Sequence, residues 1–478
     1  MIADVAIVGG GAACAHVLHA LARERLARPL RVVVIERGAD VGAGLAYGDA
    51  ADPRHTFGRV ATRRRDRGKA LRAQAARAID ALAARGSSVE VRRGTVARGF
   101  RRDAGGFAID VEPGDAITAE HVVLATGHWH VDRLAHVERA VDWRWDVRRL
   151  HAGVRDGDDV VVLGTSQSAI DIAIALSSRG TRVALASRRG LVPSVWGPLR
   201  ATRPAADTGA NLARLRARDA VVRLADIADA VRADLSALGA TPCDDPLGEP
   251  WRPRGDGLAT LRADLAAAVD ARRAAREIPW QAVLWPTVPA VFDLYPRLVA
   301  EDRVALEPSW YLLLRYLEAI HVANARRVVE LADAGRLTVV ALGRDVAIAE
   351  DAAGVVVSGE LAAARGHRIV DARGPDPRVA RSDDPFLHAV LASGVAVAGR
   401  AAYLAPHDPP FVDTGGLWVD PATFRVRDDA GRTANLYALG PLALGQFPVY
   451  LGLWALRRAG ASIAAAIARG QPANVTRR

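Results

Sequence analysis

The chain alternates short apolar runs with alanine-rich amphipathic stretches, and the alternation begins at its first residues. Residues 3–37 contain the run "ADVAIVGGG", an alanine-rich segment at 12–26, and a second run, "LRVVVIER". Continuous apolar runs of this length are typical of parallel strands that are buried on both faces. The pattern therefore predicts a strand, a glycine turn, a helix and a second strand in one βαβ unit.

The same alternation continues along the chain. Residues 88–112 predict a β-hairpin, and "HVVLATG" at 121–127 predicts another buried strand that ends in glycine. The strand–turn–helix–strand pattern returns at 159–190 in "DVVVLGTSQSAIDIAIALSSRGTRVALASRRG". Residues 200–330 have a mostly helical pattern, and 435–470 predict a strand, a glycine turn, a loop and a closing helix.

Length and repetition together predict the domain organisation. A chain of 478 residues is longer than one hydrophobic core usually supports. We expect a first dinucleotide-type domain at 1–155 that the chain rejoins at 366–478. A second such domain at 156–365 is nested within it and contains a helical insert at about 200–330. The expected fold class is therefore α/β, with two nested Rossmann-like dinucleotide-binding domains and a helical insert.

The first glycine turn has the spacing of a dinucleotide-binding fingerprint. Gly9 and Gly11 match the first two glycines of G-x-G-x-x-G, which allow the tight turn and the close approach of a pyrophosphate. Cys14 replaces the third glycine, at a position that controls how closely the helix packs on the strand. Glu36 ends the next strand, where a carboxylate accepts hydrogen bonds from a ribose. This context favours a bound dinucleotide over a plain βαβ turn.

The acidic residue and two later strands predict that this dinucleotide is FAD. Glu36 would repel the 2′-phosphate of NADP, which leaves FAD or NAD. In many two-dinucleotide flavoproteins one strand ends in Ala-Thr-Gly and a later one in Leu-Gly-Asp; here Thr126 and Gly440 lie in such motifs, although Pro441 replaces the acid. The candidate FAD-binding residues are Gly9, Gly11, Ala12, Ala13, Glu36, Arg37, Val96, Thr126, Gly127 and Gly440.

The second turn predicts an NADPH site, although its sequence departs from the glycine fingerprint. Ser166 stands where the fingerprint has its middle glycine. Arg188 and Arg189 end the following strand, where an arginine binds the 2′-phosphate of NADP through a charge-assisted, bidentate contact. A structural Rossmann unit with solvent-facing arginines is the alternative. The candidate NADPH-binding residues are Gly164, Ser166, Gln167, Ser168, Arg188 and Arg189.

Composition narrows the classes of partner. The formal net charge is +10, but the arginines are scattered among aspartates and alanines, so we expect no nucleic-acid partner. Two cysteines, Cys14 and Cys243, cannot build a disulfide framework or a zinc cluster, and no metal site is expected. The pattern contains neither a secretory leader nor an apolar run of membrane-spanning length. We therefore expect a cytoplasmic protein that does not associate with membranes.

Two residues after the first unit are candidates for catalysis. Tyr47 and His55 follow the predicted adenosine-binding unit, where the chain is expected to approach the flavin ring. His55 would act as an acid or base, although a lone histidine in a polar loop is more often solvated. His128 and His130 lack a carboxylate cluster, so a loop that lines the flavin is favoured there over a metal site.

Several motifs occur in the order of one known family. They are "DVAIVGGGAA", "GLAYG" at 44–48, "VLATGH" at 123–128, "VVVLGTSQSAIDIA", "SRRGLVP" at 187–193 and "LYALGPLALGQF" at 436–447. The chain resembles the FAD/NAD(P)-binding family that includes flavin-dependent urate hydroxylases and aspartate N-monooxygenases. "GTSQSAID" is also similar to the class B N-hydroxylases of ornithine or lysine. The segment "HTFGRVA" lacks the asparagine of the family's His-Leu-Leu-Asn-Val, so we expect a rebuilt flavin-facing loop.

The resemblance implies FAD on the first unit, NAD(P)H on the second, and hydroxylation of a small substrate with O2. We therefore predict an FAD-dependent, NADPH-using monooxygenase that acts on an amine, amino acid or heterocycle. Two alternatives stay open: an NADPH-dependent flavin oxidoreductase without oxygen insertion, and a non-catalytic FAD-binding subunit. The helical insert is expected to close over the flavin and to supply Trp280, Trp285 and Trp310 to the substrate pocket.

Overall fold

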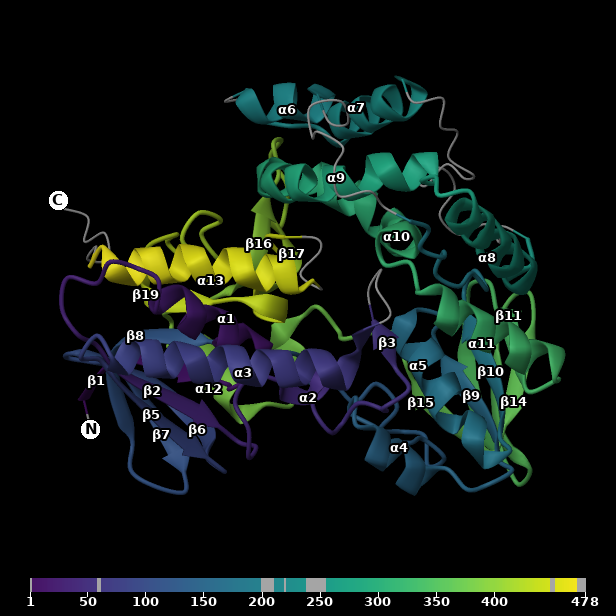
Figure 1. The fold of residues 1–478 in the computed structure, drawn as a ribbon, viewed down its shortest axis with the longest axis horizontal. Coiled ribbons are helices and arrows are strands. Elements are labelled where there is room, and N and C mark those ends of the chain that lie inside the picture. The colour runs from purple at the N-terminus through teal and green to yellow at the C-terminus, as the bar shows by residue number, and fades with distance from the viewer. Residues whose placement is uncertain are drawn as a thin grey trace. The chain divides into compact units, whose positions relative to one another are not determined.

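The computed structural model describes residues 2–57, 62–198, 210–218, 221–237, 255–447 and 452–470. The chain forms two compact units. The first contains Met1–Gly48, Arg65–Val131 and Pro375–Arg478, and the second contains Asp49–Arg64 and Asp132–Gly374. Figure 1 shows the elements of both units, coloured from purple at the N-terminus to yellow at the C-terminus.

The first unit is built on a sheet whose central strands are parallel. Its strands are β1 (Ile2–Val8), β2 (Arg31–Glu36), β5 (Ser88–Arg93), β6 (Val96–Asp103), β7 (Gly106–Glu112), β8 (Ile117–Leu124), β18 (Arg425–Arg427) and β19 (Thr433–Ala438). The described strands have the order β18-β19-β8-β1-β2-β5, and β7 connects β6 to β8. β1 is buried from Ala3 to Val8 between two parallel neighbours, as its apolar run predicts.

The hairpin predicted at 88–112 is shorter than expected. β6 and β7 form it, whereas β5 pairs in parallel with β2. The reason is connectivity, because β5 follows a long helix that returns the chain to the sheet in the direction of β2. A second hairpin, of β16 (Ala398–Ala402) and β17 (Phe411–Leu417), stands apart from the main sheet.

Helices complete the first unit. They are α1 (Ala12–Leu21), α2 (Gly44–Tyr47), α3 (Arg64–Ala83), whose first residue belongs to the second unit, α12 (Pro385–Ala392) and α13 (Leu453–Ala468), with short 3₁₀ turns at Val379–Arg381 and Gly440–Ala443. α1 and α13 pack closely because Gly460 has no side chain; a Cβ there would lie 3.0 Å from the main-chain carbon of His16. This contact places the closing helix against the helix that follows the first glycine turn.

The second unit contains a smaller parallel sheet. Its strands are β9 (Asp159–Leu163), β10 (Arg182–Ser187), β11 (Leu337–Ala341) and β15 (Arg368–Asp371), in the order β11-β10-β9-β15. β12 (Ala347–Asp351), β13 (Gly354–Ser358) and β14 (Ala363–Gly366) form an antiparallel sheet, and β3 (Thr56–Phe57) pairs with β4 (Thr62–Arg63). The predicted fold class is confirmed. Both units contain a Rossmann-like sheet with parallel strands, and helices connect those strands along the chain.

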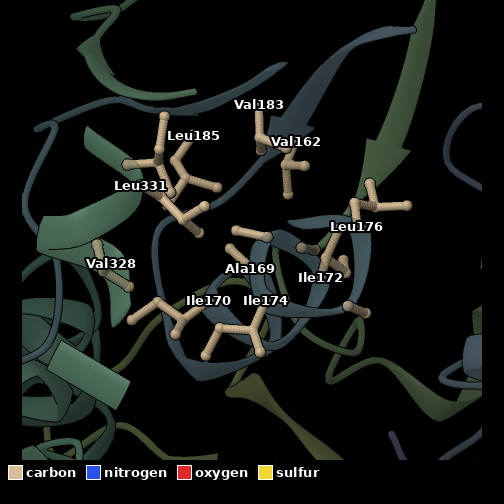
Figure 2. Close-up of a cluster of buried hydrophobic side chains, with 14 of the residues drawn as sticks. Val162, Ala169, Ile170, Ile172, Ile174, Leu176, Val183, Leu185, Val328 and Leu331 are labelled. Atoms are coloured by element: carbon tan, nitrogen blue, oxygen red, sulfur yellow. The ribbon is translucent and has the colours of Figure 1, made fainter. Parts of the chain in front are cut away.

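The core of the second unit lies between this sheet and two helices. α5 (Gln167–Leu176) contributes Ile170 and Ile174, which are buried together with Val162 and Leu185 of the strands (Figure 2). α11 (Val322–Asp333) adds Val328 and Leu331 from the other side of the cluster. Burial of such side chains contributes roughly 1.5–3 kcal/mol each before entropy is counted. The helix that carries the second turn is therefore firmly held by apolar packing.

The remaining helices form the predicted insert. They are α6 (Ala210–Ala217), α7 (Leu224–Ala237), α8 (Gly257–Arg273), α9 (Pro279–Leu294) and α10 (Ala300–Leu317); α4 (Val147–Gly153) precedes β9, and 3₁₀ turns lie at Ser177–Arg179 and Tyr295–Arg297. The ring of Trp280 makes a T-shaped contact with Tyr316, and the ring of Trp285 makes one with Trp196. The side chain of Trp310 lies outside the described residues. A role of the insert over the flavin stays a prediction.

Among the described residues, no helix combines the length and the apolarity that crossing a bilayer requires.

Candidate functional site

The turn between β1 and α1 adopts a conformation that glycine alone takes without strain. Gly9 has φ +101°, and its N–H donates to the carbonyl oxygen of Ile35 at 2.8 Å. A Cβ at Gly9 would lie 2.8 Å from the carbonyl carbon of Ala125 and would collide with its oxygen. At Gly11, with φ −75° and ψ −160°, a Cβ would make only an ordinary contact with Gly44. Gly9 is therefore needed for folding, whereas folding does not require glycine at position 11, where space for a ligand stays a prediction.

The carboxylate of Glu36 lies beside this turn. The N–H of Gly10 donates to Oε2 of Glu36 at 2.5 Å, and the N–H of Gly38 donates to Oε1 at 2.5 Å. Each carboxylate oxygen has a second acceptor position, so both remain able to accept a ribose hydroxyl. The structure thus places the glycine turn and the Glu36 carboxylate side by side, and their roles toward phosphate and ribose stay predictions.

The ends of two neighbouring strands meet at the same edge of the sheet. β8 leads into Thr126 and Gly127, and β19, which is parallel to β8, leads into Gly440. Ligands of open α/β sheets bind outside the carboxyl ends of parallel strands. The hydroxyl oxygen of Thr126 is buried and has no hydrogen-bond partner within the protein. A buried unpaired hydroxyl at this edge fits a polar cofactor that would satisfy it.

The other candidate residues of the first site surround the turn. Ala12 and Ala13 are the first residues of α1, and Ala13 is buried. Arg37 is exposed directly after β2, and Val96 begins β6 next to Thr95, whose N–H donates to Glu36 O at 3.0 Å. These residues therefore lie along one edge of the sheet, from the end of β1 to the start of β6.

Sequence reasoning missed two glycines that close over the first turn. Gly42, with φ +118°, donates its N–H to Gly10 O at 2.7 Å. Gly44, with φ +59°, comes so near that a Cβ there would lie 3.2 Å from the Cα of Gly11. The signal was present in the spacing of "VGAGLAYG", which places two left-handed glycines before a short helix. Tyr47 ends that helix and is buried.

The second turn repeats the backbone of the first despite its serine. Gly164 has φ +120°, donates its N–H to Ala186 O at 2.7 Å, and would bring a Cβ to 2.6 Å from Ala372 O. Ser166 precedes α5 with φ −80° and ψ −172°, close to the values at Gly11. Extended backbone of this kind is open to any residue, so the serine does not distort the turn. Its side chain is exposed, as it must be for contact with a ligand.

The remaining candidates of the second site lie near the carboxyl ends of β9 and β10. Arg188 is exposed and Arg189 is half-buried directly after β10, and the turn closes at Gly190 with φ +63°. Gln167 and Ser168 begin α5, and the Gln167 amide donates to the main-chain oxygen of Glu318 at 2.9 Å. The two arginines thus occupy the position at which the sequence placed them, one strand away from the glycine turn.

The three candidate histidines have different surroundings. His55 is buried, with 6% of its surface exposed, and its Nε2 donates to Asp171 O at 2.8 Å. A lone solvated histidine is therefore the wrong description of His55, because a partner distant in sequence covers it. His130 pairs with Asp383 at 2.9 Å, and His128 is exposed. The catalytic roles of His55 and Tyr47 stay predictions.

The main-chain oxygen of Glu318 contacts Gln167 at the start of α5, and the carboxyl of the same residue has a shifted pKa. Burial raises the pKa of this carboxyl to about 7, and the nearby positive charge of Arg64 opposes the shift. The carboxyl is therefore neutral below this pH and negatively charged above it. Because Glu318 contacts the start of α5 through its main chain, we expect a negative charge on its carboxyl to weaken the attraction of that helix end for an anion.

We expect the affinity for NADPH to fall as pH rises through about 7, and the Glu318→Gln variant to lose this step. The measurement is the Kd of NADPH between about pH 6 and pH 8.5. NADH is titrated in parallel, because it lacks the 2′-phosphate that also ionises in this range. An identical pH profile in the wild type and the variant would contradict the assignment.

Comparisons with known proteins agree with this geometry. Residues 6–63 match the family model described as FAD-NAD(P)-binding, and residues 60–200 match the model described as pyridine nucleotide-disulphide oxidoreductase. No curated protein matches the chain. Among solved structures, the ornithine N-hydroxylase of Kutzneria sp. 744 is 15% identical with a TM-score of 0.52, covering 98% of this chain and 100% of that one. The chain has the fold of a two-dinucleotide-binding flavoprotein.

Two further solved structures match with lower TM-scores. The ornithine hydroxylase of Pseudomonas aeruginosa is 12% identical with a TM-score of 0.49, covering 98% and 99% of the two chains. The thioredoxin reductase of T. acidophilum is 14% identical with a TM-score of 0.43, covering 98% of each. The family matches over both glycine turns make the flavoprotein an FAD-dependent oxidoreductase that binds FAD and NAD(P). These findings confirm the expected enzyme class and cofactor types.

Proposed function

We propose that this flavoprotein is a monooxygenase that uses NADPH and O2 to hydroxylate a small amine, amino acid or heterocycle. The observation that carries the proposal is the matching geometry of the two turns. Gly9 and Gly164 make equivalent contacts, and Gly11 and Ser166 share one backbone conformation. Arg188 and Arg189 also follow β10 directly, where a phosphate contact is expected. The matching turns together with these arginines favour a second nucleotide site, and so an enzyme, over a non-catalytic subunit.

The chain's own residues supply binding and orientation. The N–H groups at the start of α1 would hold the pyrophosphate of FAD, Glu36 would accept from its ribose, and the Thr126 hydroxyl would gain a partner. At the second turn, the N–H groups of Ser166, Gln167 and Ser168 would hold the pyrophosphate of NADPH. FAD, when bound, supplies the capacity to accept a hydride and to activate O2.

Disulfide reduction by this chain is disfavoured by its cysteines. A thiolate is the nucleophile in that chemistry. Cys14 is fully buried on α1, and its pKa is raised by burial and by the charge of Glu36. Cys243 lies outside the described residues, and the sequence holds two cysteines in all, without a C-x-x-C pair. The surviving alternative is an NADPH-driven flavin oxidoreductase that releases hydrogen peroxide.

The experiment that separates these two functions measures coupling. The holoenzyme is mixed with NADPH and O2 and offered amines, amino acids and purines one at a time. A monooxygenase shows a substrate that converts NADPH consumption into hydroxylated product at the expense of hydrogen peroxide. Peroxide in proportion to NADPH with every compound would contradict the monooxygenase proposal and favour the oxidoreductase.

The arginines after β10 are expected to set the choice of nicotinamide cofactor. One arginine–phosphate contact contributes about 1.5–3 kcal/mol, which corresponds to roughly a ten- to hundredfold preference for NADPH over NADH. Arg188→Ala should reduce this preference by raising the KM for NADPH more than that for NADH. Arg182→Ala is the matched control, because Arg182 lies at the opposite end of β10 and pairs with Asp159. Equal efficiency with both cofactors in the wild type would contradict the assignment.

A further inference from the structure

Residues 49–64, which we call the strap, interrupt the first unit but pack within the second. The chain leaves the first unit after Gly48 and rejoins it at Arg65, so both ends of the strap are covalently joined to that unit. β3 and β4 pair within the strap, and the N–H of Arg64 donates to His55 O at 3.0 Å. The described residues of the strap, 49–57 and 62–64, therefore belong to the second unit and are joined covalently to the first at both ends.

The strap holds α5 through one buried charge. Asp171 is the only charged residue of α5, whose other residues are apolar or small except Gln167, and 9% of its surface is exposed. Arg64 donates from Nη2 to Oδ2 of Asp171 at 2.8 Å. His55 donates from Nε2 to the main-chain oxygen of Asp171 at 2.8 Å, since a carbonyl oxygen only accepts. A carboxylate in an apolar helix is costly unless it is paired, and here both partners come from the strap.

Two further contacts fix the strap along the same side of the unit. Arg54, which forms an ion pair with Asp52 at 2.7 Å, also donates to Ala175 O at 2.9 Å near the end of α5. The Thr56 hydroxyl donates to Oδ1 of Asn324 on α11 at 2.6 Å. Figure 1 shows β3 of the strap beside α5. The strap therefore holds α5 at its middle and at its end, and leaves its first turn to the nucleotide.

Arg64 is also the first residue of α3, the helix that continues into the first unit. Along α3, Gly68 lies so close to Tyr47 that a Cβ there would collide with the carbonyl oxygen of Tyr47. A Cβ at Gly42 would lie 2.7 Å from Leu71 O. The helix that starts at the partner of Asp171 is thus packed, within the first unit, on the segment that closes over the first phosphate turn. A chain of stiff contacts of this kind can transmit a change at one nucleotide to the other.

We propose that Asp171, acting through Arg64 and His55, is a positioning residue for hydride transfer from NADPH to FAD. It keeps the strap on the nucleotide-binding helix, so that occupation of the second site is transmitted to the strap and to α3. The inference rests on the proposed use of NADPH. Asp171 touches neither cofactor by this account and acts only on their orientation.

The first test compares Asp171→Asn with the wild-type holoenzyme. We expect unchanged FAD content and a rise in the Kd for NADP+ that is small beside the loss of rate, because coupling between the nucleotide and the strap is reciprocal. The limiting rate of flavin reduction should fall by roughly tenfold or more, since a small misplacement of reacting groups has a large effect on rate. Asp171→Glu should recover part of the rate. Asp159→Asn, which removes the exposed pair with Arg182, is the matched control and should leave the rate unchanged. An unchanged rate in Asp171→Asn, or a parallel loss of FAD, NADP+ affinity and rate, would overturn the inference.

The second test needs no variant. Amide hydrogen exchange of the wild-type holoenzyme is compared with and without NADP+. We expect slower exchange at the start of α5 together with slower exchange in residues 50–57 and 62–72. Protection of α5 alone would overturn the coupling, and protection nowhere would contradict the NADPH site and the coupling with it. Failure of the proposed function is seen separately, as wild-type flavin that NADPH does not reduce.

Discussion

Replacement of Gly9 by alanine is expected to give a protein that neither folds stably nor retains FAD. Gly9 has φ +101°, which strains any residue with a Cβ, and that Cβ would meet the main chain of Ala125 on the neighbouring strand. The clashing atoms are main-chain atoms of a buried strand end and cannot move aside as a flexible side chain could. We therefore expect a loss of about 4 kcal/mol or more in the free energy of unfolding. The measurements are urea unfolding and the flavin content of the purified protein.

Gly11→Ala is the matched control for this prediction. Its backbone suits alanine, and the new Cβ would lie 3.6 Å from the Cα of Gly44. We expect a stably folded protein that binds FAD more weakly, because the methyl group occupies the space that the pyrophosphate needs. Equal stability of the two variants, or full flavin content in Gly9→Ala, would contradict the structure of the turn.

Ser166→Asp is expected to abolish reduction by NADPH without loss of FAD. The carboxylate would stand at the start of α5, where the pyrophosphate of the nucleotide is proposed to bind. Two unit charges about 4 Å apart repel by about 4 kcal/mol at an effective dielectric constant of 20. A loss of roughly a hundred- to thousandfold in NADPH affinity follows. Titration with NADP+ and the KM for NADPH measure it.

Ser178→Asp adds the same charge at the exposed, opposite end of α5 and controls for a general effect of charge. We expect its NADPH affinity to stay close to that of the wild type. A Ser166→Asp variant that still binds NADP+ tightly would place the nucleotide elsewhere. A loss of FAD in this variant would mean that the second turn supports folding of the whole chain.

The glycine turns and their strands could be predicted from sequence because local pattern determines them. β1 and β9 are buried between parallel neighbours, so their apolar runs are continuous and easily recognised. The turns follow directly, since a glycine with positive φ must end each strand. Serine in place of the middle glycine at position 166 does not argue against the turn. That position has extended backbone, which does not require glycine.

Contacts between distant residues could not be predicted in this way. His55 lies in a polar stretch, and nothing local indicates that Asp171 would cover it. The hairpin expected at 88–112 is shorter than predicted for a related reason, since β5 pairs with β2 and only β6 and β7 form the hairpin. The closure of Gly42 and Gly44 over the first turn also depends on tertiary packing. Hydrophobic periodicity identifies helices and strands, whereas the packing of loops depends on polar partners that are distant in sequence.

Anaerobic mixing of the FAD-loaded protein with NADPH shows whether this nucleotide reduces the flavin. We expect loss of the visible absorbance of oxidised flavin at a rate that saturates with NADPH, faster at low concentration than with NADH. Dithionite serves as the control that the flavin can be reduced. Flavin that dithionite reduces but that neither nicotinamide cofactor reduces would contradict the account.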